Sequence, residues 1–144
     1  MLNTAANSVT PTAWLHVAVG VIRCPTTQRI LIAQRPAGKH QAGKWEFPGG
    51  KVEASETVQQ ALVRELDEEL GIQIDPKSLT PLIEIRHHYP ERSVFLDVWQ
   101  TNQFNGEPTG REGQALQWCE VHALTTLDFP EANQAIIQAL QSSV

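Results

Sequence analysis

The sequence has little cysteine, no long hydrophobic run and no excess of positive charge. Two cysteines occur among 144 residues, Cys24 and Cys119, so no disulfide framework is indicated and each thiol is interpreted as a buried strand residue. No apolar run approaches the ~18 residues of a membrane span, and MLNTAANSVT lacks the features of a secretory signal. The formal net charge of −5 argues against coating nucleic acid or lying on an anionic membrane. A cytoplasmic protein is expected, without a nucleic acid polymer or a membrane among its partners.

The composition that is present is that of one globular domain, with 41% hydrophobic and 19% charged residues. Residues 1–13 show no periodicity and are expected to form a flexible N-terminal extension, followed by a single domain over 14–144. Apolar and alternating patterns predict strands, and longer periodic patterns predict helices. The predicted strands cover 14–22, 29–34, 79–88, 93–101 and 115–121, and the predicted helices cover about 56–70 and 130–141. The first two strands are expected to form a hairpin, and the order of elements predicts an α/β fold, an α/β/α sandwich around a mixed sheet.

The chain is organised around residues 49–72, GGKVEASETVQQALVRELDEELGI. On a helix, leucines spaced by four residues form one stripe, and Glu65, Glu68 and Glu69 fall within a neighbouring arc of roughly 100°. Like charges at these spacings repel each other by ~0.2–0.5 kcal/mol per pair. One interpretation is a solvated acidic face. The other is a divalent cation that relieves the repulsion, and all-oxygen ligation suits Mg²⁺ or Mn²⁺.

The acidic helix also has a specific frame. Two glycines precede it, Ser55 is the expected N-cap, Gly71 is expected just beyond the helix end, and Arg64 can orient the acids. In this arrangement the stretch resembles the Nudix hydrolases. Their motif runs Gly, five residues, Glu, seven residues, Arg-Glu, an aliphatic, any residue, Glu-Glu, any residue, Gly and an aliphatic. The residues that fill its constrained positions are Gly50, Glu56, Arg64, Glu65, Leu66, Glu68, Glu69, Gly71 and Ile72.

The resemblance implies hydrolysis of a phosphoanhydride by water with help from a metal ion. The implied metal ligands are the carboxylates of Glu65, Glu68 and Glu69 and a backbone carbonyl of Gly49 or Gly50. The Nudix fold is also an α/β/α sandwich around a mixed sheet, so the order of the predicted elements and the resemblance predict the same architecture.

One carboxylate must accept a proton from the attacking water. Glu65 is the first candidate for this general base, and Glu112, in the glycine-rich loop GREG, is the second. Glu112 is alternatively a further metal ligand or a solvated loop acid. Glu56 has two interpretations, a favourable charge at a helix N-terminus and a metal ligand.

Three basic residues near the motif are candidate phosphate contacts. Lys51 directly follows the two glycines, and Arg35 and His40 lie in the loop before the motif. A solvated loop position is the alternative for each of them.

Outside the motif, EFPGGKVE, GEPTGREGQ and FPEAN resemble the MutT-type members of the family, which hydrolyse 8-oxo-dGTP. In those enzymes the Asn of the last segment contacts the oxidised guanine, and Asn133 holds that place here. Arg92 and Phe129 are further candidates for the base-binding pocket. The resemblance thus implies a pyrophosphohydrolase acting on a small-molecule nucleoside triphosphate, and the protein is expected to be a monomer.

Two alternatives remain open at the level of sequence. QAGKWEF and QALQWC resemble the family members that hydrolyse CTP or 5-methyl-dCTP. A Nudix module that only senses a nucleotide is the other alternative, although such a module has no need for the complete set of motif glutamates.

Overall fold

Strand β1, Trp14–Ile22, lies inside the larger of two sheets in the computed structural model, which describes residues 14–38 and 42–142. The order of strands in this sheet is β4-β1-β6-β5. β1 runs parallel to β6, with Trp14 opposite Ser93 and Ile22 opposite Thr101, whereas the other two pairings are antiparallel. The sheet is therefore mixed, as predicted. Its other strands are β4 (Gly49–Lys51), β5 (Thr80–His88) and β6 (Ser93–Thr101).

A smaller sheet of three antiparallel strands adjoins it, in the order β3-β2-β7. Its strands are β3 (Trp45–Glu46), β2 (Ile30–Gln34) and β7 (Leu116–Cys119). β3 and β4 are separated only by Phe47 and Pro48, so the chain passes from one sheet to the other immediately before the two glycines of the motif.

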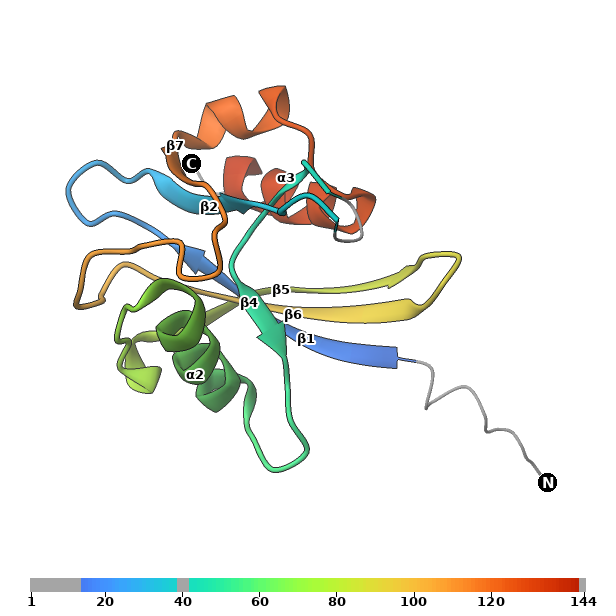
Figure 1. The fold of residues 1–144 in the computed structure, drawn as a ribbon, viewed down its shortest axis with the longest axis horizontal. Helices are drawn as coiled ribbons and strands as arrows, with labels where there is room; N and C mark the ends of the chain where they lie inside the picture. The colour runs from blue at the N-terminus through green and yellow to red at the C-terminus, as the bar shows by residue number, and fades with distance from the viewer. Residues whose placement is uncertain (1–13, 39–41, 143–144) are drawn as a thin grey trace.

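Two helices, α2 (Val58–Leu70) and α3 (Gln134–Ser142), lie on opposite sides of the strands (Figure 1). The alternation of β1 explains this arrangement. Ala18 and Ile22 belong to the hydrophobic cluster of α2, whereas Val19 and Val21 belong to the cluster of α3. Because both faces of β1 are covered, its sequence is a nearly continuous apolar run. The predicted α/β architecture with helices on both sides is confirmed.

Helix α2 begins later than predicted. Its N-cap is Thr57, not Ser55: the Gln60 amide donates to Thr57 Oγ1 (3.1 Å), and the Thr57 amide donates to Gln60 Oε1 (2.8 Å). This reciprocal capping box satisfies two amides that a cap at Ser55 would leave unpaired. The helix ends as predicted at Gly71, which adopts a left-handed conformation with φ 73°.

The prediction that the first two strands form a hairpin is wrong, because they pair only next to the turn that joins them. Arg23 and Ile30 form an isolated bridge, and the Cys24 amide donates to the Arg29 carbonyl (2.8 Å). β1 then pairs with β4 and β6, and β2 pairs with β3 and β7, so the two strands enter different sheets. Short-range alternation does not determine which distant strand a given strand pairs with.

Three short 3₁₀ helices were not predicted: η2 (Pro76–Ser78), η3 (Val121–Thr126) and η4 (Glu131–Asn133). The last of these replaces the first turn of the predicted C-terminal helix, so that α3 begins at Gln134. The expected extension over 1–13 lies outside the described residues. Within those residues, no helix is long and apolar enough to cross a bilayer.

Candidate active site

Gly50 and Glu65 meet where β4 passes under α2. A Cβ atom placed on Gly50 would lie 2.3 Å from Cδ of Glu65 and 2.5 Å from its Oε2. Glycine is therefore required here to leave room for the carboxylate. The side chain of Glu65 is only 16% exposed. The neighbouring Gly49 has φ 153°, and a Cβ there would lie 2.0 Å from the Ala18 carbonyl oxygen.

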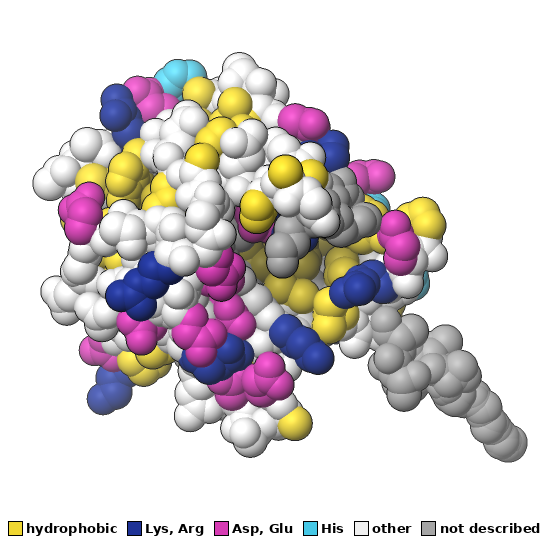
Figure 2. All heavy atoms as spheres, in the orientation of Figure 1, with side chains coloured by type: hydrophobic (Ala, Val, Ile, Leu, Met, Phe, Trp, Pro, Cys, Tyr) yellow, Lys and Arg dark blue, Asp and Glu magenta, His cyan; other side chains and the backbone are white. Residues whose placement is uncertain are grey.

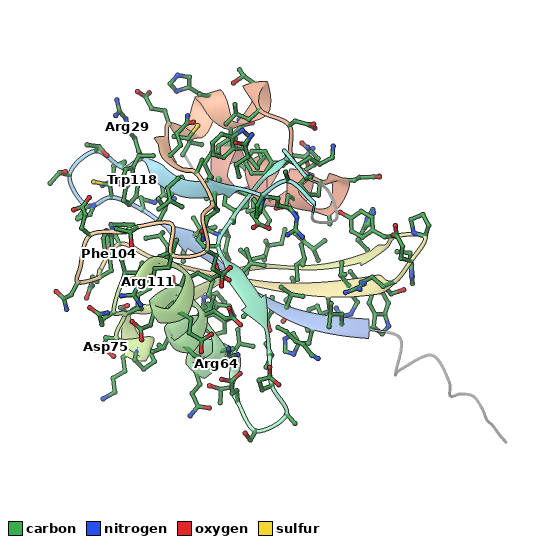
Figure 3. All side chains as sticks on the ribbon, viewed as in Figure 1. Arg29, Arg64, Asp75, Phe104, Arg111 and Trp118 are labelled. Carbon is green, nitrogen blue, oxygen red and sulfur yellow. The ribbon has the colours of Figure 1, made fainter. Side chains whose placement is uncertain are left out.

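Arg64 contacts three acidic residues of the motif, Glu56, Glu65 and Glu68. The sequence predicted that Arg64 orients these acids. It contacts both oxygens of Glu56, with Nε 2.6 Å from Oε2 and Nη2 2.9 Å from Oε1. Its Nη1 lies 2.9 Å from Glu65 Oε2 and 3.4 Å from Glu68 Oε1, and its Nη2 donates to the Lys51 carbonyl (3.1 Å). Figure 3 shows Arg64 on the side of α2 that faces the loop after β4. The bidentate contact with Arg64 lowers the pKa of Glu56 to about 2. Glu56 is thus held as the ionised partner of Arg64.

Glu69 lies one helical turn beyond Glu65 and is crowded by other carboxylates. Burial raises the pKa of Glu69 well above its ordinary value, and a hydrogen bond with Glu65 and the charges of Glu65, Glu112 and Glu46 raise it further. Carboxylates that are held together in a partly buried place repel one another. The Glu65–Glu69 pair is therefore a place where a positive charge is favourable.

The loop between β6 and β7 is fastened to the C-terminal end of α2. The Thr109 amide donates to the Leu70 carbonyl and the Arg111 amide donates to the Glu69 carbonyl, both at 3.0 Å. Arg111 Nη1 also donates to the Asp67 carbonyl (3.0 Å). These donors satisfy carbonyls that lack partners at a helix end. They also bring Glu112 close enough for its charge to raise the pKa of Glu69. Glu68 is farther out, with its side chain 58% exposed.

A cavity of about 570 Å³ adjoins the acidic cluster and shares Glu46, Gly49 and Gly50 with it. Figure 2 shows acidic side chains gathered over α2 and β4, next to a hollow with a hydrophobic floor. Apolar side chains of β1 and β6 form much of the wall, including Leu15, Val17, Val19, Val94 and Leu96. A largely apolar cavity with a few polar groups at its edge is typical of a small-molecule site.

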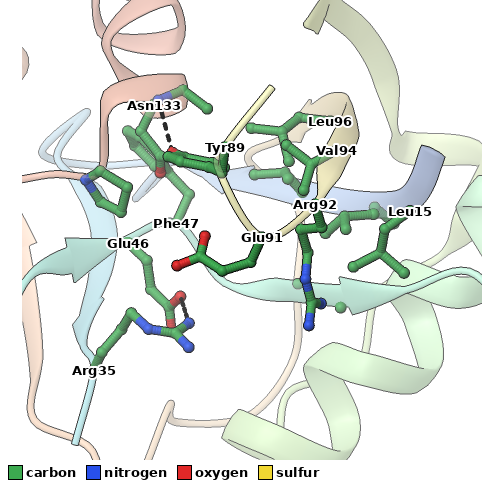
Figure 4. A pocket seen from close by; sticks show the side chains of 17 residues that line it. Leu15, Arg35, Glu46, Phe47, Tyr89, Glu91, Arg92, Val94, Leu96 and Asn133 are labelled. Atoms are coloured by element: carbon green, nitrogen blue, oxygen red, sulfur yellow. Dashed lines mark hydrogen bonds and ion pairs between the residues drawn. The ribbon is translucent and has the colours of Figure 1, made fainter. Parts of the chain in front are cut away.

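Three predicted substrate-binding residues line this cavity: Arg35, Arg92 and Asn133 (Figure 4). Arg35 Nη1 forms an ion pair with Glu46 Oε1 (2.7 Å). The guanidinium of Arg92 and the side-chain amide of Asn133 have no hydrogen-bond partner among the residues that the structure describes. Both groups are available to a ligand.

Three other predicted residues are placed differently. Phe129 is only 3% exposed and stacks on Phe47 with ring centroids 5.2 Å apart, so it supports the cavity wall from behind and does not line it. Lys51 is exposed at the end of β4 and does not line the cavity. His40 lies outside the described residues.

Three residues that line the cavity were not singled out from the sequence: Glu46, Tyr89 and Glu91. Glu46 stands in the quoted segment EFPGGKVE, and its place beside the motif glycines was the available signal. For Tyr89 and Glu91 the signal was weaker, because only the fold brings the turn between β5 and β6 to the cavity.

The donor set fits a hard divalent cation. Two facing carboxylates, Glu65 and Glu69, with the Gly49 and Gly50 backbone beside them, supply only oxygen donors. Across residues 14–38 and 42–142, however, no three acidic, histidine or cysteine side chains converge as a complete ligand group. Glu68 and Glu112 are both exposed.

These features together define a class of protein. Residues 18–139 match the family described as the NUDIX domain, and the chain belongs to the Nudix family. Nudix hydrolases depend on divalent metal ions, in agreement with the all-carboxylate site.

Two relatives by sequence and one solved structure show which members of the family this chain is similar to. An 8-oxo-dGTP diphosphatase of Escherichia coli (strain K12) is 42% identical over 127 residues, which cover 88% of this chain and 96% of the relative. A CTP pyrophosphohydrolase of the same strain is 39% identical over 117 residues, covering 79% of this chain and 83% of the relative. A MutT structure from work on Aliivibrio salmonicida and Vibrio cholerae has a TM-score of 0.78 and 35% identity, covering 91% of this chain and 99% of that one.

Proposed function

We propose that this Nudix enzyme is an Mg²⁺-dependent 8-oxo-dGTP diphosphatase, which converts 8-oxo-dGTP and water to 8-oxo-dGMP and pyrophosphate. The observation that carries the proposal is the position of Asn133, whose unpaired amide lines the cavity next to the acidic cluster. The 8-oxo-dGTP diphosphatase of E. coli, at 42% identity over most of both chains, supports the same assignment. The proposed activity would remove oxidised guanine from the nucleotide pool before DNA replication incorporates it.

In the proposed reaction, water attacks the β-phosphorus, a new P–O bond forms, and the bond to the oxygen bridging the α- and β-phosphates breaks. The nucleoside monophosphate leaves with that oxygen. Glu65 is the first candidate to accept the water's proton, because Gly50 and Arg64 hold its carboxylate in one place. Glu112 remains the second candidate. Glu65, Glu69 and the motif backbone, with Glu68 or Glu112, would hold a divalent cation, which would neutralise charge on the phosphates and acidify water. Mn²⁺ has the same ligand preference as Mg²⁺.

The cations of the site have separate proposed roles. Arg35 lines the cavity and pairs with Glu46, so exchange of Glu46 for a phosphate oxygen would hold the triphosphate beside the motif glycines. Arg92 lines the cavity, and we assign its guanidinium a contact with the nucleoside. Lys51 and His40 remain candidate phosphate contacts.

Asn133 provides a physical basis for selecting the oxidised base. A side-chain amide offers one acceptor and one donor group side by side. In 8-oxoguanine, N7 carries a hydrogen and O6 accepts, so both hydrogen bonds form. In guanine, N7 is an acceptor that would face the amide oxygen. An unpaired polar group in a buried site costs about 1–3 kcal/mol, and a site built for such pairing discriminates by up to ~10⁴–10⁵.

A second candidate function is hydrolysis of CTP or 5-methyl-dCTP. The E. coli CTP pyrophosphohydrolase, 39% identical to this chain, favours it. The reaction at the acidic cluster would be unchanged, and only the base bound by the cavity residues would differ. A nucleotide sensor without turnover is a third reading, which the intact set Glu65, Glu68 and Glu69 argues against.

The test is a panel of kcat/KM values for 8-oxo-dGTP, dGTP, CTP and 5-methyl-dCTP with Mg²⁺. The proposal predicts that 8-oxo-dGTP is the best substrate and that pyrophosphate is a product. A preference for CTP or 5-methyl-dCTP would move the enzyme to the pyrimidine group, and the absence of turnover on all four would favour the sensor. A cytoplasmic location belongs to the same proposal, since the enzyme must meet the free nucleotide pool. We also propose that the enzyme is a monomer.

A further inference from the structure

The hydroxyl of Tyr89 joins two parts of the chain that are far apart in sequence. The Ala132 amide donates to Tyr89 Oη at 3.0 Å, across 43 residues (Figure 4). Tyr89 is the first residue after β5, and Ala132 lies in η4, just before α3. This contact closes one side of the cavity, because both residues line it.

The two residues joined by this hydrogen bond lie close in sequence to the two groups available to a ligand, the Arg92 guanidinium and the Asn133 side-chain amide. On the turn, Tyr89 and Arg92 exchange backbone hydrogen bonds of 2.8 and 3.2 Å, so the position of Tyr89 determines the position of Arg92. On the other side, Ala132 directly precedes Asn133, whose backbone amide donates to the Pro130 carbonyl (3.0 Å). The hydroxyl thus connects the two groups that face the cavity from different elements.

The hydrogen bond also has a local structural reason. The amide of Ala132 belongs to the first turn of a helix, where amides lack partners within the helix. Ala132 is only 4% exposed, so water has little access to that amide. The phenol supplies the missing acceptor. Its ring is held separately, by an edge-on contact with His87 at 4.5 Å between centroids, and that contact does not need the hydroxyl.

We propose that the Tyr89 hydroxyl is a positioning group for base selection, which acts by holding η4 so that the Asn133 amide faces the base. This inference rests on the proposed role of Asn133 in reading the base. Tyr89 is not assigned any role in the chemical step, because the acidic cluster lies on α2, next to β4.

Tyr89→Phe tests the proposal, because it removes the hydroxyl and keeps the ring. For the preferred nucleotide, kcat/KM is expected to fall by about tenfold, the effect of one buried donor losing its partner. The loss is expected in KM, with kcat nearly unchanged, because the chemistry is untouched. The ratio of kcat/KM for 8-oxo-dGTP over dGTP should fall with it, since dGTP does not make the full set of contacts with Asn133.

A double-mutant cycle separates positioning from general stability. If Tyr89 acts through Asn133, Tyr89→Phe should leave the selectivity ratio unchanged in the Asn133→Ala background. Ser78→Ala is the matched control: it removes a hydroxyl bonded to the Asp75 carbonyl (2.8 Å) and to Thr101 Oγ1 (2.9 Å), at the other end of β5. This control should keep the wild-type ratio even where it lowers the melting temperature.

Three results would overturn the proposal: unchanged kcat/KM values in Tyr89→Phe, an equal loss of kcat/KM for every nucleotide, or full additivity with Asn133→Ala. Failure of the proposed function gives a different result. In that case the wild type itself prefers another nucleotide, and the cycle is run on the ratio of that nucleotide over its nearest analogue. The same three results then decide the role of Tyr89.

Discussion

Gly50→Ala is predicted to inactivate the enzyme while leaving it folded. The added Cβ would fall 2.3 Å from Cδ of Glu65, far inside contact distance, so the Glu65 carboxylate must move by more than an ångström. The clash is with the end of a flexible side chain and not with backbone, so the free energy of unfolding should change by no more than about 1 kcal/mol. A catalytic group misplaced by ~1 Å costs ~10²-fold in rate. We therefore expect kcat/KM to fall by at least ~10²-fold.

The assay is pyrophosphate release under Mg²⁺ saturation, with thermal unfolding followed in parallel. Gly20→Ala is the matched control in the same sheet: its Cβ would lie 3.5 Å from side-chain carbons of Leu62 and Leu66, an ordinary packing distance. The control should keep activity. Near-normal turnover in Gly50→Ala would refute the argument that Glu65 must occupy the space over Gly50.

Three further predictions follow from the same geometry. Glu65→Gln and Glu68→Gln should both lower kcat, by orders of magnitude and by more in the first, because Glu65 is 16% exposed and Glu68 58%; equal turnover to wild type in both would remove the metal-site argument. Glu56 has a pKa lowered from about 4.5 to about 2 by Arg64, so it contributes stability above pH 4.5 that is lost as the pH falls towards 2. In Glu56→Gln, the free energy of unfolding measured in urea should lack this part of the pH dependence. An unchanged dependence at acid pH would contradict the pairing of Glu56 with Arg64. Phe129→Ala should lower the free energy of unfolding by about 3–5 kcal/mol but keep the order of nucleotide preference; a changed order would show that Phe129 contacts the base after all.

The local part of the site could be predicted from the sequence because it lies on one helix. The periodicity of α2 places its leucines and its glutamates on neighbouring faces, and Arg64 lies among the acids as expected. The end of the helix at Gly71 followed from its residue type. The N-cap was misplaced by two residues, because both Ser55 and Thr57 are suitable caps and only the reciprocal contact with Gln60 distinguishes them.

The non-local part of the site could not be predicted in the same way. Which strands pair depends on contacts across the whole chain, so the splitting of β1 and β2 between two sheets was missed. Glu46 acquires its importance only because the passage from β3 to β4 brings it beside Glu69. Tyr89 reaches Ala132 only after α3 is packed against the sheet. These contacts surround the base-binding cavity, and this is why substrate choice was harder to predict than reaction type.

The central claim is that the acidic helix determines the reaction and that Asn133 selects the base. The most direct test is the ratio of kcat/KM for 8-oxo-dGTP over dGTP in the wild type and in Asn133→Ala. We predict a large ratio in the wild type and a fall of ~10²-fold or more in the variant, since two hydrogen bonds are lost, with turnover of dGTP largely retained. An equal ratio in the two proteins would contradict the claim.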